Sequence, residues 1–150
     1  MIAIALRPST GRKWGTVSFA STLHLCPILD LLLVDVPERL QSEIRLGLQE
    51  ALVNAAKHGN NLDPNKTIAV QFFFVGNQYW WIISDQGSGF LDDLPEISEQ
   101  CQNVPFESQE RGRGLYILNQ VFDKVQWDRG GTELRLCKQF PTPSRLSPRR

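Results

Sequence analysis

Residues 50–60 read Glu-Ala-Leu-Val-Asn-Ala-Ala-Lys-His-Gly-Asn, and this stretch is the most informative part of the chain. Glu50, Asn54 and His58 are spaced four apart, so in an α-helix each lies about 40° around the axis from the last. The same side of the helix carries the small residues Gly47, Ala51 and Ala55. Small side chains let a flat ligand approach, and the Asn54 carbonyl oxygen suits a hard cation such as Mg²⁺. An ordinary solvated helix face is the alternative interpretation.

The composition excludes several classes of protein. Lys+Arg and Asp+Glu number 16 each in 150 residues, and this zero net charge argues against direct nucleic-acid binding, which needs a concentrated basic surface. The three cysteines, Cys26, Cys101 and Cys137, form no CxxC pair, which favours reduced thiols over a disulfide framework or a zinc site. Residues 1–6 are too short for a secretory signal, and two aspartates interrupt the apolar run 28–36. We therefore expect a cytoplasmic protein without a membrane span.

The pattern along the chain predicts one α+β domain over residues 15–138. Residues 1–14 are expected to be loose, and residues 139–150 to form a disordered basic tail. Strands are expected at 15–20, 67–75, 78–84, 124–127 and 132–137, and helices at 22–34, from an Asp35 cap to a stop at Gly59, and at 115–122.

Two connections in this pattern carry further information. Gly76-Asn77 separates two strands by two residues, which predicts a tight antiparallel hairpin. The aromatic runs in this hairpin, 72–74 and 80–81, are expected to pack in the core and on the sheet. Residues 91–112 lack periodicity and predict a long loop, of the kind that often forms a lid.

The first glycine-rich segment is Asp85-Gln-Gly87-Ser-Gly89-Phe90, which directly follows a strand. A carboxylate in such a partly dry place can accept the exocyclic amine of an adenine. The glycines would leave room for the flat base. A plain β-turn is the alternative.

The second segment is Glu110-Arg-Gly112-Arg113-Gly114-Leu115, which follows the long loop and opens the expected helix. Glycines there allow backbone N–H groups to point at a phosphate from a helix N-terminus, and Arg113 adds a positive fork. A flexible hinge is the alternative. The segment is neither a Walker motif nor the dinucleotide-binding GxGxxG motif.

The order of these segments resembles one superfamily. ExxxN on a helix, DxGxG after a strand, a long loop, GxGL on a helix and Gly-Thr-Glu-Leu at 131–134 resemble the N, G1 and G2 boxes and the GT motif of the GHKL (histidine kinase-like) ATPases. Residues 50–59 and 111–117 further resemble the bacterial anti-sigma factor serine/threonine-protein kinases. The resemblance covers roughly residues 15–138 and implies the Bergerat-type two-layer α/β sandwich. In that fold, helices cover one face of a mixed, mostly antiparallel sheet.

The resemblance also implies a role for each matching residue. Glu50 would be the general base that takes the proton from an attacking serine hydroxyl, and Asn54 would hold Mg²⁺ against the triphosphate of ATP. Asp85 would accept the adenine amine, with Thr132 completing that contact. The remaining implied positions are Lys57 and His58 near phosphate or ribose, Gly87, Gly89 and Phe90 around the base, and Gly112, Arg113, Gly114 and Leu115 around the phosphates.

The partners are likewise implied by the resemblance. Such kinases bind a sigma factor and phosphorylate a serine of an anti-anti-sigma (STAS-type) protein, usually as homodimers. An ATP-gated interaction module with little turnover is the main alternative, and the presence of Glu50 favours the kinase. A detached histidine-kinase catalytic domain is disfavoured because only 49 residues precede Glu50, too few for a dimerisation hairpin. A topoisomerase- or chaperone-type ATPase is disfavoured because no transducer domain is present.

Overall fold

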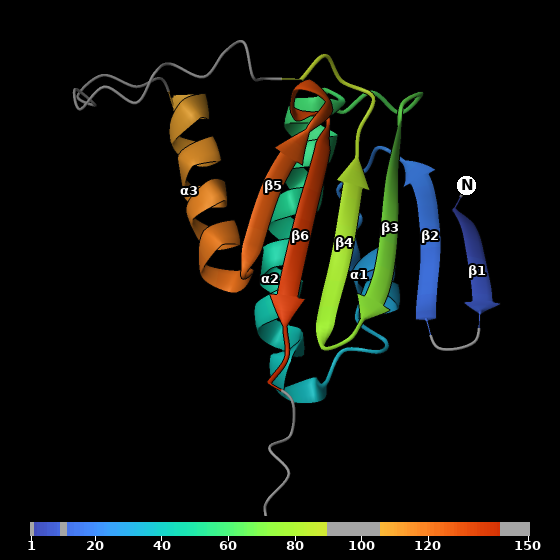
Figure 1. Ribbon diagram of the computed structural model, residues 1–150. Helices are drawn as coiled ribbons and strands as arrows, with labels where there is room; N and C mark the ends of the chain where they lie inside the picture. The colour runs from blue at the N-terminus through green and yellow to red at the C-terminus, as the bar shows by residue number, and fades with distance from the viewer. Residues whose placement is uncertain (1, 10–11, 90–105, 142–150) are drawn as a thin grey trace, which may run out of the picture.

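A six-stranded sheet forms one layer of the protein, and helices cover one of its faces (Figure 1). The computed structural model describes residues 2–9, 12–89 and 106–141. The strands are β1 (Ala3–Ser9), β2 (Arg12–Ala20), β3 (Thr67–Val75), β4 (Gln78–Ser84), β5 (Lys124–Asp128) and β6 (Glu133–Gln139). The helices are α1 (Cys26–Leu32), α2 (Glu38–Asn54), the π-helical turn η1 (Ala55–Gly59), α3 (Phe106–Val121) and the 3₁₀ turn η3 (Arg129–Gly131).

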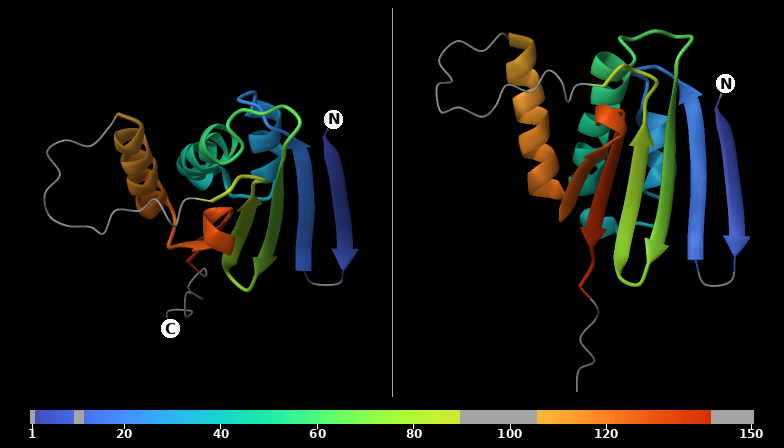
Figure 2. Two further views of the ribbon diagram at one scale, coloured as in Figure 1. Left: turned by 90° about the horizontal axis from the view of Figure 1, so that it is seen from above. Right: turned by 45° about the horizontal axis from the view of Figure 1, so that its top comes forward.

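The predicted fold class is confirmed. The strands lie in the order β1-β2-β3-β4-β6-β5, and each neighbouring pair is antiparallel rather than mixed. Figure 2 shows α1 and α2 against the same face of the sheet, with α3 beside α2 near β5. Between the layers lies a core whose largest fully buried side chains are those of Trp81, Phe19, Leu29, Ile44, Leu48, Leu52, Ile68, Leu118, Leu134, Leu136, Val17 and Val70.

The N-terminal segment differs from the expectation of a loose chain. β1 pairs with β2 from Ala3↔Ser18 to Ser9↔Arg12, so the ordered fold begins well before residue 15. Pro8 is typical of a loop. Proline is also compatible with an edge strand, because a backbone nitrogen that faces away from the neighbouring strand donates no hydrogen bond to the sheet. β1 is such an edge in the spatial order of the sheet.

The central hairpin has the predicted boundaries and turn. β3 and β4 pair in a register that ends at Val75↔Gln78, with Gly76 at φ +61° in the two-residue turn. The aromatic runs pack as expected. The Phe73 and Trp80 rings stack on the helix-free face with centroids 6.2 Å apart, and Trp81 is buried on the other face.

The helix boundaries differ from the sequence pattern at several points. α1 begins four residues after the expected start, and Pro27 lies in its first turn. α2 starts at Glu38 after Pro37, and Asp35 does not cap it. α3 begins at Phe106, so the glycines at 112 and 114 lie inside the helix, not at its start. The glycine pattern misplaced this boundary because it takes no account of the packing of α3 against α2.

The end of the domain lies slightly beyond the expected position. β6 continues to Gln139, and Phe140 is 7% exposed and packs edge-on against the Tyr79 ring, with centroids 4.5 Å apart. The expected disorder of the tail concerns residues 142–150, which lie outside the described part. Cys26 and Cys137 are free thiols. Among the described residues, no helix combines the length and the apolar character needed to cross a bilayer.

Gly47 lies where α2 meets the end of α3, and this contact corrects its predicted role beside a ligand. A Cβ at Gly47 would lie 2.6 Å from Cε2 of Phe122 and 2.8 Å from Cγ1 of Val121. Gly47→Ala is therefore expected to cost about 1–3 kcal/mol through overpacking. The helix-propensity gain of roughly 1 kcal/mol offsets part of this cost, so the free energy of unfolding should fall by up to about 2 kcal/mol. Thermal unfolding followed by circular dichroism measures the change.

Gly112→Ala is the matched control, because a Cβ at Gly112 meets nothing within 4 Å. This substitution gains helix propensity and creates no steric clash, so the free energy of unfolding should rise by about 0.5–1 kcal/mol. A higher melting temperature for Gly47→Ala would contradict the proposed packing role.

Candidate functional site

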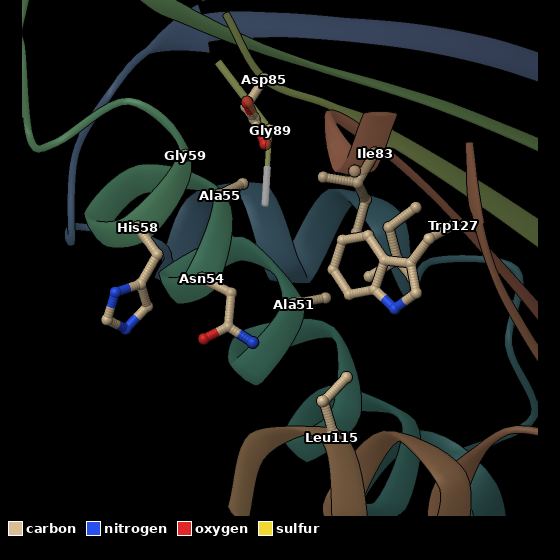
Figure 3. Close-up of a pocket in the computed structure, with 12 residues that line it drawn as sticks. Ala51, Asn54, Ala55, His58, Gly59, Ile83, Asp85, Gly89, Leu115 and Trp127 are labelled. Atoms are coloured by element: carbon tan, nitrogen blue, oxygen red, sulfur yellow. The ribbon is translucent and has the colours of Figure 1, made fainter. Parts of the chain in front are cut away.

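The C-terminal end of α2 changes from α-helical to π-helical winding as it enters the site. The N–H of Asn60 donates to the carbonyl of Ala55 at 2.9 Å, an i→i−5 bond that closes η1. π-helical turns are rare and often occur at functional sites. The wider π-helical turn changes the four-residue spacing that an ideal α-helix would give to Asn54 and His58. Both side chains nevertheless line one pocket (Figure 3).

This pocket lies between α2, the sheet and α3. Its apolar walls are Ala51 of α2, Ala55 of η1, Ile83 of β4, Leu134 of β6, Trp127 of β5 and Leu115 of α3. Its polar side chains are Asn54, His58 and Asp85. Figure 3 shows Asp85 at one end of the pocket and Leu115 at the other, with Asn54 at the end of α2 and His58 on η1. A mostly apolar pocket with a few polar side chains is typical of a small-molecule binding site.

Asp85 is held at one end of the pocket by backbone contacts. Its N–H donates to the carbonyl of Thr132 at 3.0 Å, and its Oδ1 accepts the N–H of Gly87 at 2.8 Å. Burial raises the pKa of the Asp85 carboxyl above its usual value, while the Gly87 N–H and the charge of Lys66 partly oppose the shift. A desolvated carboxylate of this kind gains from a ligand that donates a hydrogen bond.

The glycines near Asp85 make room for other parts of the chain: the Asp85 side chain and the backbone of Gly59 and Gly130. A Cβ at Gly59 would lie 2.8 Å from Oδ1 of Asp85, and one at Gly87 would lie 2.7 Å from the carbonyl carbon of Gly59. Gly89 has φ +84°, and its Cβ would lie 2.9 Å from the carbonyl carbon of Gly130. The expectation that Gly87 and Gly89 leave space for a base is thus modified: the space beside them is filled by backbone. Of the two, Gly89 lines the pocket.

Glu50 and Asn54 lie together beside the second glycine segment. A Cβ at Gly114 would lie 3.2 Å from Nδ2 of Asn54 and 3.5 Å from Oε2 of Glu50. Both side chains are half-buried. The glycine therefore lets α3 approach the two polar side chains that the helix pattern of α2 singles out.

Other predicted site residues lie outside this pocket. Lys57 is exposed, and Gly112 and Arg113 line a separate shallow hollow with Tyr116 and Ile117. The N–H groups of residues 112–115 lie in the middle of α3, so the expected helix N-terminus is not at this point.

Thr132 and Phe90 are the remaining predicted site residues. The hydroxyl of Thr132 donates to the carbonyl of Arg129 at 2.9 Å, so Thr132 contacts Asp85 through its backbone. Phe90 lies outside the described residues.

Two residues at the site have no role in the sequence-based prediction. Trp127 is expected there only as part of a strand, and its place in the pocket follows from β5 pairing with β6 at Trp127↔Leu134. Asn60 is completely buried, and its carboxamide joins the end of η1 to β3 and to the segment after Asp85. The sequence signal for Asn60 is its place directly after Gly59, but its side-chain partners, Thr67 and Gln86, lie 7 and 26 residues further along the chain.

Comparison with known proteins agrees with this architecture. The histidine kinase-like ATPase domain family matches residues 29–138. The chain therefore belongs to the histidine kinase-like ATPase domain family, and the predicted superfamily is confirmed.

Individual proteins similar to this chain are named anti-sigma F factor. The chain is 27% identical over 84 residues to proteins named anti-sigma F factor from Geobacillus stearothermophilus and Geobacillus kaustophilus (strain HTA426). It is 26% identical over 84 residues to one from Anoxybacillus flavithermus (strain DSM 21510 / WK1). Each match covers 56% of this chain and 57% of the relative, so the similarity spans little more than half of those proteins.

Proposed function

We propose that the chain is an ATP-dependent serine/threonine protein kinase that acts as an anti-sigma regulatory factor. The observation that carries this proposal is the pocket itself. A desolvated carboxylate, Asp85, lies at one end of an apolar slot, and Glu50 and Asn54 lie together beside α3. Family membership and the anti-sigma F factor relatives support the same conclusion.

In this proposal, the apolar slot holds adenine. The ring would lie between the small side chains of α2 and the wall formed by Trp127 and Ile83, which exclude water. Asp85 would accept the exocyclic amine. The phosphates would extend along α2 past Asn54 and His58, with Lys57 and the residues 112–115 near them.

The described residues fit a magnesium ion that arrives with the nucleotide. They contain no group of three or more His, Cys, Asp or Glu side chains placed to hold a metal. The Oδ1 atom of Asn54 lies 3.7 Å from the Cβ position at Gly114, and Oε2 of Glu50 lies 3.5 Å from the same position. Oxygens of this kind suit Mg²⁺ when phosphates and waters supply most of its ligands. When bound, the ion would spread the charge that builds up during phosphoryl transfer.

Glu50 would take the proton of the attacking serine hydroxyl. The serine oxygen would form a bond to the γ-phosphorus as the bond to the β,γ-bridging oxygen breaks, and ADP would leave. The proposed acceptor is a serine of a STAS-type anti-anti-sigma protein, and the proposed second partner is a sigma factor. We further propose a cytoplasmic location and a homodimer.

One observation favours an ATP-gated interaction module with little turnover. Gly114 packs against Glu50 and Asn54, so α3 covers the proposed reaction centre. A domain that kept α3 in this position could bind the base and signal its presence without transferring phosphate.

Two measurements test the proposal. Calorimetry with millimolar ATP and Mg²⁺ should record binding, and incubation with a STAS-type protein from the same organism should yield phosphoserine or phosphothreonine. Binding without transfer would support the gated module. The absence of binding by the folded protein would exclude both functions.

Asn54→Ala is expected to reduce the gain in nucleotide affinity that Mg²⁺ provides by about 10–100-fold, because one oxygen ligand to a charged group is lost. The affinity measured in EDTA should change little. Titration of ADP with and without Mg²⁺ measures both values. Asn65→Ala removes an exposed carboxamide away from the pocket and serves as the control. Equal losses with and without Mg²⁺ would place Asn54 in base binding instead.

A further inference from the structure

Asn60 holds three backbone segments together beneath the site. Its side chain is 0% exposed. Nδ2 donates to the carbonyl of Thr67 at 3.0 Å, and Oδ1 accepts the N–H of Gln86 at 2.8 Å. Its own N–H closes η1 at Ala55. A buried carboxamide that is bonded on both sides defines the relative positions of its partners more strictly than apolar packing does.

Gln86 completes the arrangement from the opposite side. Its Oε1 accepts the N–H of Thr67 at 2.8 Å. Both backbone groups of Thr67, the first residue of β3, are therefore bonded by side chains of the other two segments. We call Asn60, Gln86 and the backbone of Thr67 the Asn60–Gln86 clamp.

The clamp is directly connected to the end of the pocket where Asp85 lies. Asn60 follows Gly59, whose Cα lies against the Asp85 carboxyl, and Gln86 follows Asp85 itself. A shift of either clamp residue therefore moves one side of this contact. Misplacement of a recognition group by about 1 Å is enough to weaken its selective interactions severely.

We propose that Asn60 and Gln86 are positioning residues that fix the Asp85 carboxylate and thereby set the preference for adenine over guanine. This inference rests on the proposed function. Adenine presents an amine donor to the carboxylate, whereas guanine presents a carbonyl oxygen at the same ring position, which a carboxylate repels. A rigid carboxylate enforces this difference, whereas a mobile one can turn away or admit a bridging water.

The test measures the ratio of the dissociation constants for GDP and ADP, together with the melting temperature. Gln86→Ala is the main variant because Gln86 is exposed and loses one hydrogen bond. We expect its ratio to fall about 5–10-fold from the wild-type value. Asn60→Ala should lower the ratio further, with a lower melting temperature because buried backbone groups lose their partners.

Two variants separate positioning from general stability. Gln86→Glu retains an acceptor oxygen for the Thr67 N–H, so the ratio should return to within about twofold of wild type. Gln41→Ala removes a carboxamide that donates to the carbonyls of Leu33 and Val36 near the start of α2. It should lower the melting temperature and leave the ratio unchanged.

Each remaining outcome would reject a specific statement. If the wild type prefers ADP and Gln86→Ala keeps the full preference, the positioning role is wrong while the proposed function stands. If the wild type binds both nucleotides equally, the carboxylate does not select the base and the clamp has no such role. If the wild type binds neither, the proposed function fails, and the inference fails with it.

Discussion

Glu50→Ala is expected to abolish phosphotransfer while ATP affinity stays within about twofold of the wild-type value. Loss of a general base lowers a rate by about 10²–10⁴-fold. Glu50 is not among the residues that line the pocket, and its Oε2 lies 3.5 Å from the Cβ position at Gly114. In the proposed function, the carboxylate would therefore act on the incoming hydroxyl, and it would contribute little to holding the base.

Transfer of labelled phosphate from ATP to the STAS-type protein measures the rate, and calorimetry measures the affinity. Glu50→Gln keeps the size of the side chain but accepts no proton at neutral pH, so it should be as inactive as the alanine variant. Gln49→Ala changes the adjacent exposed residue of α2 and should transfer at the wild-type rate. Transfer at the wild-type rate by Glu50→Ala would show that the base has been wrongly assigned.

Local patterns were enough to predict the parts of the fold whose interactions are close in the chain. The β3–β4 hairpin followed from a two-residue turn between two strands, and its register ends at Val75↔Gln78 as that turn requires. The small residues Ala51 and Ala55, at the end of α2 and the start of η1, both line the pocket, on the side that the helix pattern singles out. In each case the deciding interactions lie within one turn or one helix.

Features that depend on distant partners could not be predicted in this way. The π-helical turn is stabilised by Asn60, whose side-chain partners are Thr67 and Gln86. Gly47 shares the small-residue pattern of Ala51 and Ala55, yet it faces Phe122 because α3 packs there. The role of a small residue thus depends on which neighbour the tertiary fold brings to it, and the helix pattern does not contain that information.

Asp85→Asn is expected to change nucleotide binding and stability in opposite directions. The Oδ1 atom would continue to accept the N–H of Gly87, so the second carboxylate oxygen would be replaced by an amide NH₂. That group donates, and it would face the donating amine of adenine. We expect ADP affinity to fall about 100-fold or more, because a buried polar pair is left unmatched. GDP, with a carbonyl oxygen at that position, should lose less.

The stability change follows from the raised pKa of Asp85. Between the ordinary aspartate pKa of about 4 and the raised value, the folded protein binds more protons than the unfolded chain. The free energy of unfolding of the wild type therefore falls as the pH rises through this interval, and the loss persists at neutral pH. The carboxamide of the Asp85→Asn variant does not ionise. Without nucleotide, this variant should therefore melt at a higher temperature than wild type at pH 7, and its advantage should shrink below about pH 4.

Asp63→Asn provides a matched control for this experiment. Oδ1 of Asp63 accepts the N–H of Asn65 at 2.9 Å, two residues further along the chain, as Oδ1 of Asp85 does with Gly87. Asp63 is not among the residues lining the pocket. Its substitution should leave ADP affinity unchanged. Undiminished ADP affinity of Asp85→Asn would remove the base-recognition role of Asp85, and a lower melting temperature at pH 7 would show that its carboxylate stabilises the free protein. The predicted combination, a more stable protein that no longer binds, is characteristic of a group that is kept desolvated for its ligand.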